Sequence, residues 1–506
     1  MPSARATAAA QWAGPCRCRP RPQPRLASAS GSASFSYGSF STFSGSTGLS
    51  FAPSERTSAL VTAFGASSEG DFGYGTALRK YTAPNELTWY PRQNNQARRG
   101  GALARFTYEG DVEASVMIEA DGGLRGLPGT AGQPSSVDHQ EDVRGLGVGR
   151  LAFFAPWGLR VEARLIGRLG RLRVWTPFSD GSAQDEVHVF GEVGVSKLWG
   201  RNAIEIGVTG GRESLSSTAH GNPDRGSFGA YVVDEISFSF LSVIPAFRYE
   251  RVGREDGYSP KLGLSVPVGE HVSIKANAGR SFRAPSFGEL YLRQGTMLSD
   301  PNLKSETGLS VDLGPELHWG PVTASLAAFW GQYENLIVYE RGAHLAHPVN
   351  LWFGRSQVWG SEVEASFQKG PVSASAAYTL GFSAIRIDDP SRPEYKLYDG
   401  SELPYHPRHR LHARVGVEWW RLEAHAEADM QSNQFLTLTN QDSLPGHTRF
   451  DLGVSVVLDK DVGLSLHAEI KNLFDASTDQ DLYGYPLPGR AFYLALRFDS
   501  LQRSNP

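Results

Sequence analysis

The chain alternates between apolar and polar side chains over most of its length, and this alternation restricts its fold more than any other feature. One face of residues 422–430 carries Leu422, Ala424, Ala426, Ala428 and Met430, and the other carries Glu423, His425, Glu427 and Asp429. Successive side chains of a β-strand point to opposite faces, so this segment predicts a strand that is apolar on one side only. Four ionisable groups in a row need water. A large transmembrane β-barrel provides lipid outside and a hydrated lumen inside.

The composition argues against several other classes of protein. The 506 residues are 40% hydrophobic, and no run approaches the roughly 20 apolar residues that a membrane-spanning helix requires. A closed β-barrel is the other structure that satisfies every backbone polar group in lipid. The formal net charge of −4 offers no basic surface for nucleic acid. Both cysteines, Cys16 and Cys18, precede the alternating region, which suits a chain that crosses an oxidising compartment unfolded.

Short turns divide the alternating region into strands. They contain Gly, Pro, Asn, Asp or charged residues and lie between two alternating segments. Ten of them fall near residues 53–56, 109–111, 156–158, 199–202, 240–242, 269–271, 320–321, 369–371, 420–421 and 459–461. The turn near Phe240 has the weakest signal. Ten turns that each join two strands, with a first and a last strand, predict an all-β antiparallel barrel of about 22 strands, the size of plugged outer-membrane transporters rather than of porins.

Tryptophans gather beside the short turns, at Trp157, Trp199, Trp319, Trp419 and Trp420. Aromatic girdles lie at this level of a transmembrane barrel, where membrane meets water. The competing interpretation is a soluble antiparallel sheet whose tryptophans belong to an ordinary core. Long strands with one charged face favour the membrane barrel, because a soluble sandwich needs apolar inner faces from two sheets.

Several sequence blocks are similar to the motifs of one family and occur in the family's order. Residues 282–291 read FRAPSFGELY, residues 300–306 DPNLKSE, residues 359–365 WGSEVEA, residues 403–410 LPYHPRHR, residues 471–475 KNLFD and residues 483–490 YGYPLPGR, followed by an aromatic-ended strand at residues 492–498. These blocks resemble the barrel of TonB-dependent outer-membrane receptors, within the cobalamin and catecholate-siderophore branch. The resemblance covers residues 33–498 and implies a barrel of 22 strands.

The resemblance also implies a function without covalent chemistry. A family member takes up a metal chelate (siderophore) or a cobalamin-like ligand through the outer membrane, and the TonB–ExbB–ExbD system drives the uptake. We therefore expect a transporter rather than an enzyme, surrounded by the lipid of a Gram-negative type outer membrane. Phe498 resembles the terminal aromatic residue that the barrel assembly machinery reads, although eight residues follow it. The other interpretation is a plug-less passive pore or a non-functional fragment.

The N-terminal region departs from the family pattern. Members carry a signal peptide, a short segment that contacts TonB and a long plug domain before the barrel. Here residues 34–40 already look like a first barrel strand, and residues 1–32 are rich in Arg, Pro and Ala with no apolar signal-peptide core. We expect residues 1–32 to be a disordered tail, residues 33–498 the barrel and residues 499–506 a C-terminal tail. We also expect a start codon downstream of the true one, or a frameshift that replaces the plug.

The sequence assigns no catalytic residue, no metal ligand and no cofactor. His406, His409 and His412 are close in sequence, but on a strand His409 points away from the other two. The acidic segments 180–186 and 388–399 lack the spaced Asp/Asn ladder of a calcium loop, so solvated loop charge explains them better. No nucleophile elbow, HExxH motif or phosphate-binding glycine loop is present in the sequence.

Ligand recognition should lie in the long loops, which carry aromatic residues in polar surroundings. The candidates are Trp89, Tyr90, Tyr291, Trp352 and Phe353. Aromatic surfaces suit a large, planar, partly apolar chelate or corrinoid. Arg92, Arg293 and Arg355 lie nearby in the sequence and are available for its carboxylate or phosphate groups. The competing interpretation is that these aromatic residues extend the outer girdle of the barrel.

Overall fold

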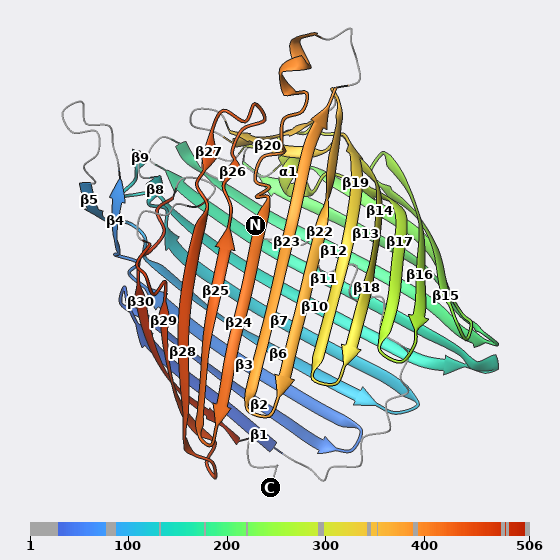
Figure 1. The fold of residues 1–506 in the computed structure, drawn as a ribbon, viewed down its shortest axis with the longest axis horizontal. Coiled ribbons are helices and arrows are strands. Elements are labelled where there is room, and N and C mark those ends of the chain that lie inside the picture. The colour runs from blue at the N-terminus through green and yellow to red at the C-terminus, as the bar shows by residue number, and fades with distance from the viewer. Residues whose placement is uncertain are drawn as a thin grey trace.

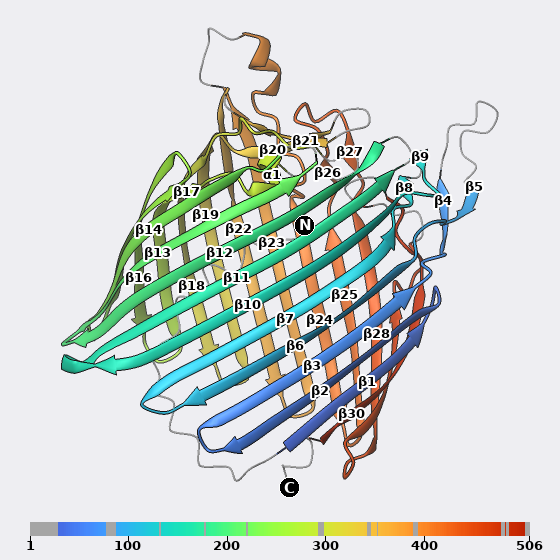
Figure 2. The ribbon, with the colours of Figure 1, turned by 180° about the vertical axis from the view of Figure 1, so that it is seen from behind.

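The computed structural model describes residues 29–76, 88–130, 133–176, 179–218, 221–291, 298–341, 346–351, 353–387, 393–476, 481 and 485–500. These residues form an antiparallel sheet of 22 strands that closes on itself as a barrel (Figures 1 and 2), so the predicted fold class and strand number are confirmed. The strands are β1 (Ala29–Gly38), β2 (Thr42–Ser54), β3 (Thr57–Ser68), β6 (Ala97–Glu109), β7 (Val112–Gly126), β10 (His139–Ala155), β11 (Leu159–Thr176), β12 (Ser179–Trp199), β13 (Asn202–Ser217), β14 (Asp224–Ser237), β15 (Ser242–Val252), β16 (Glu255–Val268), β17 (Val272–Arg283), β18 (Glu306–Trp319), β19 (Val322–Glu334), β22 (Arg355–Lys369), β23 (Val372–Arg386), β24 (His409–Trp419), β25 (Leu422–Gln431), β28 (His447–Asp459), β29 (Leu464–Lys471) and β30 (Ala491–Asp499).

The first and last strands close the sheet. β1 pairs with β2 along one side and with β30 along the other. The closing β1–β30 ladder has seven residue pairs, from Ser32 with Asp499 to Gly38 with Tyr493, whereas the β10–β11 ladder has seventeen. Closure pairs both sides of every barrel strand. A lipid environment requires this, because unpaired backbone groups find no water there.

The ten predicted short turns are all present at one end of the barrel, including the turn after β14 near Phe240 (Figure 1). Each leaves only two to four residues between its strands. We call this the turn end and the opposite end, with the longer connections, the loop end. The φ angle of Gly320 is 55°, a left-handed conformation that glycine adopts freely because it lacks a Cβ.

The two faces of the wall differ as the alternation predicts. Outward positions carry exposed apolar side chains such as Phe35, Leu165 and Val232, whereas the opposite face of β25 carries only ionisable groups from Glu423 to Asp429. The tryptophans beside the short turns are exposed, and Trp157 reaches 83%. An ordinary apolar core would bury them, so their exposure favours the membrane-interface interpretation. Within the described residues, no helix is long and apolar enough to cross a membrane.

The ends of the barrel correct the predicted boundaries. β1 begins at Ala29, so residues 29–32 belong to a strand and not to the tail. β30 ends at Asp499, one residue beyond the predicted end. Pairing explains both extensions, because Ser32 pairs with Asp499 and the Gly31 N–H donates to Ser500 Oγ at 2.7 Å. Residues 1–28 and 501–506 lie outside the described residues, so the tails stay predictions.

Smaller elements lie at the loop end, except for the 3-10 turn η1 (Pro156–Gly158) at the turn end. They are the strand pairs β4 (Gly73–Thr76) with β5 (Thr88–Pro91), β8 (Gly129–Thr130) with β9 (Gln133–Pro134), β20 (Ile337–Arg341) with β21 (Ala346–Asn350) and β26 (Gln434–Phe435) with β27 (Ser443–Leu444), and the helices α1 (Phe287–Tyr291) and η2 (Pro393–Tyr398). Two buried apolar clusters of the described residues also lie there; one contains Leu336, Leu351, Ile385, Leu403 and Leu438, and the other contains Leu290, Leu303 and Ile337. The loops therefore pack into a structured rim.

Candidate functional site at the loop end

The inner wall of the barrel carries charged side chains that pair across neighbouring strands. Arg150 Nε lies 2.8 Å from Glu162 Oε1, and Arg160 Nη2 lies 2.8 Å from Glu113 Oε2. The Tyr231 hydroxyl donates toward the carboxylates of Glu192 and Glu205, each at 2.9 Å. These residues occupy inward positions of their strands, so this part of the inner wall is polar and charged.

The segment after β17 begins the structured rim with a short helix. Ser286 and Glu289 form a capping box: the Ser286 N–H donates to Glu289 Oε2 at 2.7 Å, and the Glu289 N–H donates to Ser286 Oγ at 3.1 Å. Burial raises the pKa of Glu289, but hydrogen bonds from the Arg283 guanidinium and the Ser286 N–H outweigh burial and hold that pKa below its ordinary value. Glu289 is therefore an anion that fixes the start of α1.

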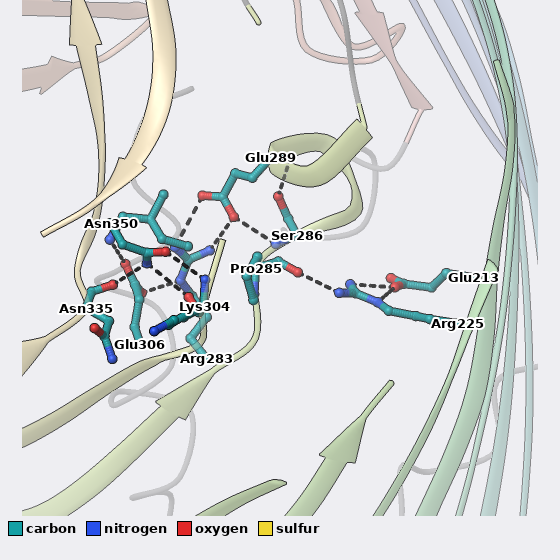
Figure 3. Close-up of polar contacts among 11 residues, drawn as sticks. Glu213, Arg225, Arg283, Pro285, Ser286, Glu289, Lys304, Glu306, Asn335 and Asn350 are labelled. Carbon is teal, nitrogen blue, oxygen red and sulfur yellow. Dashed lines mark hydrogen bonds and ion pairs between the residues drawn. The ribbon is translucent and has the colours of Figure 1, made fainter. Parts of the chain in front are cut away.

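Arg283 connects α1 to the barrel wall. Its guanidinium donates to Glu289 at 2.9 Å and 3.2 Å and also forms an ion pair with Glu306, the first residue of β18 (Figure 3). The Glu306 side chain is only 8% exposed, and its Oε1 accepts the Ile337 N–H at 2.6 Å. A buried carboxylate needs such partners because it has lost its hydration. One charged network thus joins β17, α1, β18 and β20.

Asn350 fastens the loop before β18 to the loop after β19 (Figure 3). Its Oδ1 accepts the Lys304 N–H at 2.7 Å, and its Nδ2 donates to the Lys304 carbonyl at 3.0 Å and to the Asn335 carbonyl at 2.7 Å. Each of these bonds satisfies a backbone group that no strand pairs. The two loops therefore behave as one unit of the rim.

Arg225 ties this unit to a more distant part of the wall, on β14. It donates to the Pro285 carbonyl at 2.7 Å and pairs with Glu213 of β13 at 2.6 Å (Figure 3). Its guanidinium also lies over the Phe287 ring, 5.2 Å from the ring centroid. The segment after β17 thus reaches past β15 and β16 to the start of β14, because these two strands separate β14 from β17 in the sheet.

Two of the predicted ligand residues belong to packed aromatic groups of the rim. Tyr291 packs against the cluster around Leu290 and meets Phe287 edge to face, with ring centroids 5.0 Å apart. Phe353 stacks on Tyr395 of η2 with centroids 4.6 Å apart and on Tyr398 at 5.2 Å. Trp352 lies outside the described residues. Sequence reasoning missed Tyr395 and Tyr398, although two tyrosines in a polar loop are an aromatic signal of the same kind.

Trp89 and Tyr90 lie on β5, in a different part of the loop end. Their exposed fractions are 55% and 37%, so they present an aromatic surface to solvent. The β4–β5 pair stands apart from α1 in both views of the barrel (Figures 1 and 2). The structure therefore does not bring the predicted aromatic residues into one site; it forms one surface at β5 and another around Phe353.

The three arginines predicted beside a ligand have different positions. Arg92 is only 4% exposed, and its guanidinium lies over the rings of Tyr74 and Tyr485 and donates to the Gly129 carbonyl. The expectation that Arg92 is available to a ligand is therefore wrong, because stacking between two tyrosines buries it. Arg355 opens β22 and is partly buried, and Arg293 lies outside the described residues.

The histidine group near residue 409 does not converge. His406 Nδ1 lies 2.7 Å from the Pro404 carbonyl, His409 Nδ1 lies 2.8 Å from the Tyr378 hydroxyl, and His412 Nδ1 lies 2.9 Å from Asp429 Oδ1. Each of the three imidazole rings therefore has its own hydrogen-bond partner. The three histidines are polar side chains at the start of β24 and on the barrel wall.

Comparisons with known proteins place this geometry in a family. Residues 50–473 match the family model described as TonB dependent receptor-like, beta-barrel. The vitamin B12 transporter BtuB of Vibrio vulnificus is 26% identical over 191 residues, which are 34% of this chain and 30% of BtuB. The iron-regulated outer membrane virulence protein of Vibrio cholerae is 23% identical over 333 residues, which are 59% of this chain and 49% of that protein. The chain thus matches at most about half the length of these curated relatives.

A solved structure reproduces the fold. The siderophore receptor PiuA of Acinetobacter baumannii superposes with a TM-score of 0.72 at 13% identity, covering 94% of this chain and 82% of PiuA. At this identity the likeness shows the fold alone. The named relatives are a vitamin B12 transporter and an outer membrane virulence protein. Because the family model covers most of the barrel, the chain belongs to the TonB-dependent receptor-like β-barrel family.

Proposed function

We propose that the chain forms the barrel of an outer-membrane receptor that takes up a metal chelate of the siderophore type or a cobalamin-like ligand. Membership of the receptor family supports this function, and so do relatives named for vitamin B12 and for siderophores. In this proposal the barrel sits in the outer membrane, the assembly machinery inserts it, and the TonB–ExbB–ExbD system supplies energy. The barrel performs no covalent step; uptake follows from differential binding and a conformational change.

The observation that carries the proposal is the three-ring stack of Phe353, Tyr395 and Tyr398 at the loop end. The Phe353 ring stacks on the Tyr395 and Tyr398 rings with centroids 4.6 Å and 5.2 Å apart, and the three partly exposed residues together form an aromatic surface at the loop end. Stacked and edge-to-face aromatic contacts contribute about 0.5–1.5 kcal/mol each beyond the burial of their area. Such a surface fits the aromatic rings of a catecholate chelate or the flat face of a corrin. We name the stack the aromatic platform.

The test is ligand binding by the full chain folded in detergent micelles, with a ferric tricatecholate chelate and cyanocobalamin as separate probes. We expect saturable quenching of tryptophan fluorescence by one probe. The double variant Phe353→Ala/Tyr395→Ala should weaken that binding about tenfold or more, since two aromatic contacts are lost. The matched control is Phe154→Ala, an exposed aromatic residue beside the turn end, which should bind like the unmodified chain.

Two results would contradict the proposal: neither probe binds, or the double variant binds as tightly as the control. Conductance in planar bilayers tests the alternative function, a passive pore. A large current without gating would favour a passive pore, because an open barrel of 22 strands encloses a wide aqueous channel.

A further inference from the structure

Three neighbouring strands place two histidines and two glutamates on one patch of the inner wall, on strands that carry no residue of the aromatic platform. Direct pairing across β25, β28 and β29 gives two rows, one with Glu423, Ser455 and His467 and the next with His425, Gly453 and Glu469. The central strand contributes only serine and glycine. The ionisable side chains therefore start from the four corners of a small patch, and the central strand leaves room for the His425 imidazole to lie over Gly453.

His425 is the most buried member of this patch. Its side chain is 9% exposed, and its Nδ1 is buried without a hydrogen-bond partner. The nitrogen-bearing edge of its ring lies directly over Gly453, so that a Cβ at residue 453 would overlap the imidazole. The edge thus points across β28 toward β29. A buried nitrogen lone pair or N–H without a partner costs free energy, so this position favours a ligand that can occupy it.

His467 faces His425 from the far strand. The two ring centroids are 6.2 Å apart, and the ring planes differ by 18°. The Nδ1 of His467 lies 2.7 Å from Ser455 Oγ. When Nδ1 donates its hydrogen to that hydroxyl, Nε2 holds the lone pair and is ready to bind an ion. Histidine ligands of metals are oriented by such hydrogen bonds from the second ring nitrogen.

Carboxylates complete the chemistry of the patch. Glu423 is half exposed, and its nearest cation among the described residues is Arg414 at 3.9 Å. Glu469 is paired with Lys471 at 2.7 Å. Within the described residues no three His, Cys, Asp or Glu side chains already converge on one point. Rotation of Glu423 is therefore the step that would supply a third ligand beside the two imidazoles.

We propose that His425 and His467 form a binding site for a divalent transition-metal ion on the inner wall, with Glu423 as a third ligand and Ser455 orienting His467. Two imidazoles and one carboxylate suit Cu²⁺, Ni²⁺ or Zn²⁺, and Cu²⁺ binds such donors most tightly in this series. Both histidines come from a segment of the wall that takes no part in the aromatic platform, so the ion site is independent of the chelate that the receptor takes up.

The experiment titrates Cu²⁺ into the full chain, folded in detergent micelles, in a Cys16→Ser/Cys18→Ser background so that tail thiols do not compete. We expect one tight site per chain. Variants His425→Asn and His467→Asn should each weaken Cu²⁺ binding at least about tenfold. Loss of a residue that only hydrogen-bonds a metal ligand lowers metal affinity about 10–100-fold, and loss of the ligand itself should cost at least as much. Ser455→Ala should show a smaller loss. The matched control is His412→Asn, another histidine of the wall, with unchanged affinity.

Pulsed electron paramagnetic resonance of the bound Cu²⁺ gives a second readout that needs no variant to fold. Two coupled imidazole nitrogens support the pair. A spectrum with one or no imidazole, equal affinity in either histidine variant and the control, or the absence of a tight site would each overturn the proposal.

Discussion

Glu306 shows how one buried carboxylate can join two loops. One oxygen accepts the backbone N–H of Ile337 at 2.6 Å, and the other pairs with Arg283. A typical hydrogen bond contributes little net free energy to folding, but a buried polar group without a partner destabilises the fold by its full desolvation free energy. Removing Arg283 should therefore destabilise this part of the rim by more than the net free energy of its hydrogen bonds, because Glu289 and Glu306 both lose their cation.

We expect Arg283→Met to loosen the segment after β17 by about 1–3 kcal/mol of opening free energy, the usual cost of a buried group without its partner. Hydrogen exchange of the amides of residues 284–291 and 298–305 measures this. The matched control is Arg280→Met on the same strand, where the exposed arginine donates, among the described residues, only to the Tyr258 carbonyl. Equal exchange rates in the two variants would remove Arg283 from the network.

The lowered pKa of Glu289 predicts a pH dependence for α1. A carboxylate whose folded-state pKa lies below its ordinary value of 4.5 contributes stability above that value and loses the contribution as pH falls through the folded-state pKa. Protection of the α1 amides, corrected for intrinsic exchange, should therefore fall as the pH drops below about 4.5. Glu289→Gln should show lower protection at neutral pH and little further loss on acidification; a loss as large as in the unmodified chain would contradict this assignment.

At the scale of elements, the strands could be predicted and the rim could not. Alternation and turn chemistry are local signals, so the ten turns, including the one near Phe240, followed from the sequence. The capping box of Ser286 and Glu289 was not predicted, although its Ser-x-x-Glu spacing is a local signal. The contact of Arg225 with Pro285, by contrast, joins residues 60 positions apart. No local pattern revealed that Arg92 is stacked between tyrosines, or that Phe353 meets η2.

Strand β22 offers a matched pair of glycines that tests the wall itself. Gly360 and Gly381 face each other across β22 and β23. A Cβ at residue 360 would overlap the Leu380 carbonyl oxygen, whereas a Cβ at residue 381 would meet no atom within 4 Å. We expect Gly360→Ala to lower the free energy of unfolding by about 1–3 kcal/mol and Gly381→Ala to change it by less than about 0.5 kcal/mol.

Urea unfolding of the two glycine variants in lipid vesicles, followed by tryptophan fluorescence, measures this difference. The prediction fails if the two variants unfold at the same urea concentration, because the register of β22 and β23 would then not force the overlap at Gly360.

For the whole molecule, closure by β30 makes the C-terminal residues decisive. Phe498 pairs with Ala33 of β1 and with Leu464 of β29. We expect Phe498→Ala to reduce the folded fraction in the outer membrane, because the substitution removes the proposed assembly signal and the aromatic side chain of the closing strand. Deletion of residues 501–506 should leave that fraction unchanged, because β30 ends at Asp499. Heat-dependent migration on gels reports the folded fraction, and equal yields from Phe498→Ala and the deletion would refute the role of Phe498.

The ladder between β1 and β30 also decides when this protein can finish folding. It joins the first strand of the barrel to the last, so a chain that lacks β30 cannot form it. Until then both margins of the growing sheet offer open hydrogen-bonding rows, which are templates for aggregation. The β1–β30 ladder is also short: it has seven residue pairs, whereas the β10–β11 ladder has seventeen. The barrel sheet therefore keeps both margins unpaired until β30 is available to pair with β1.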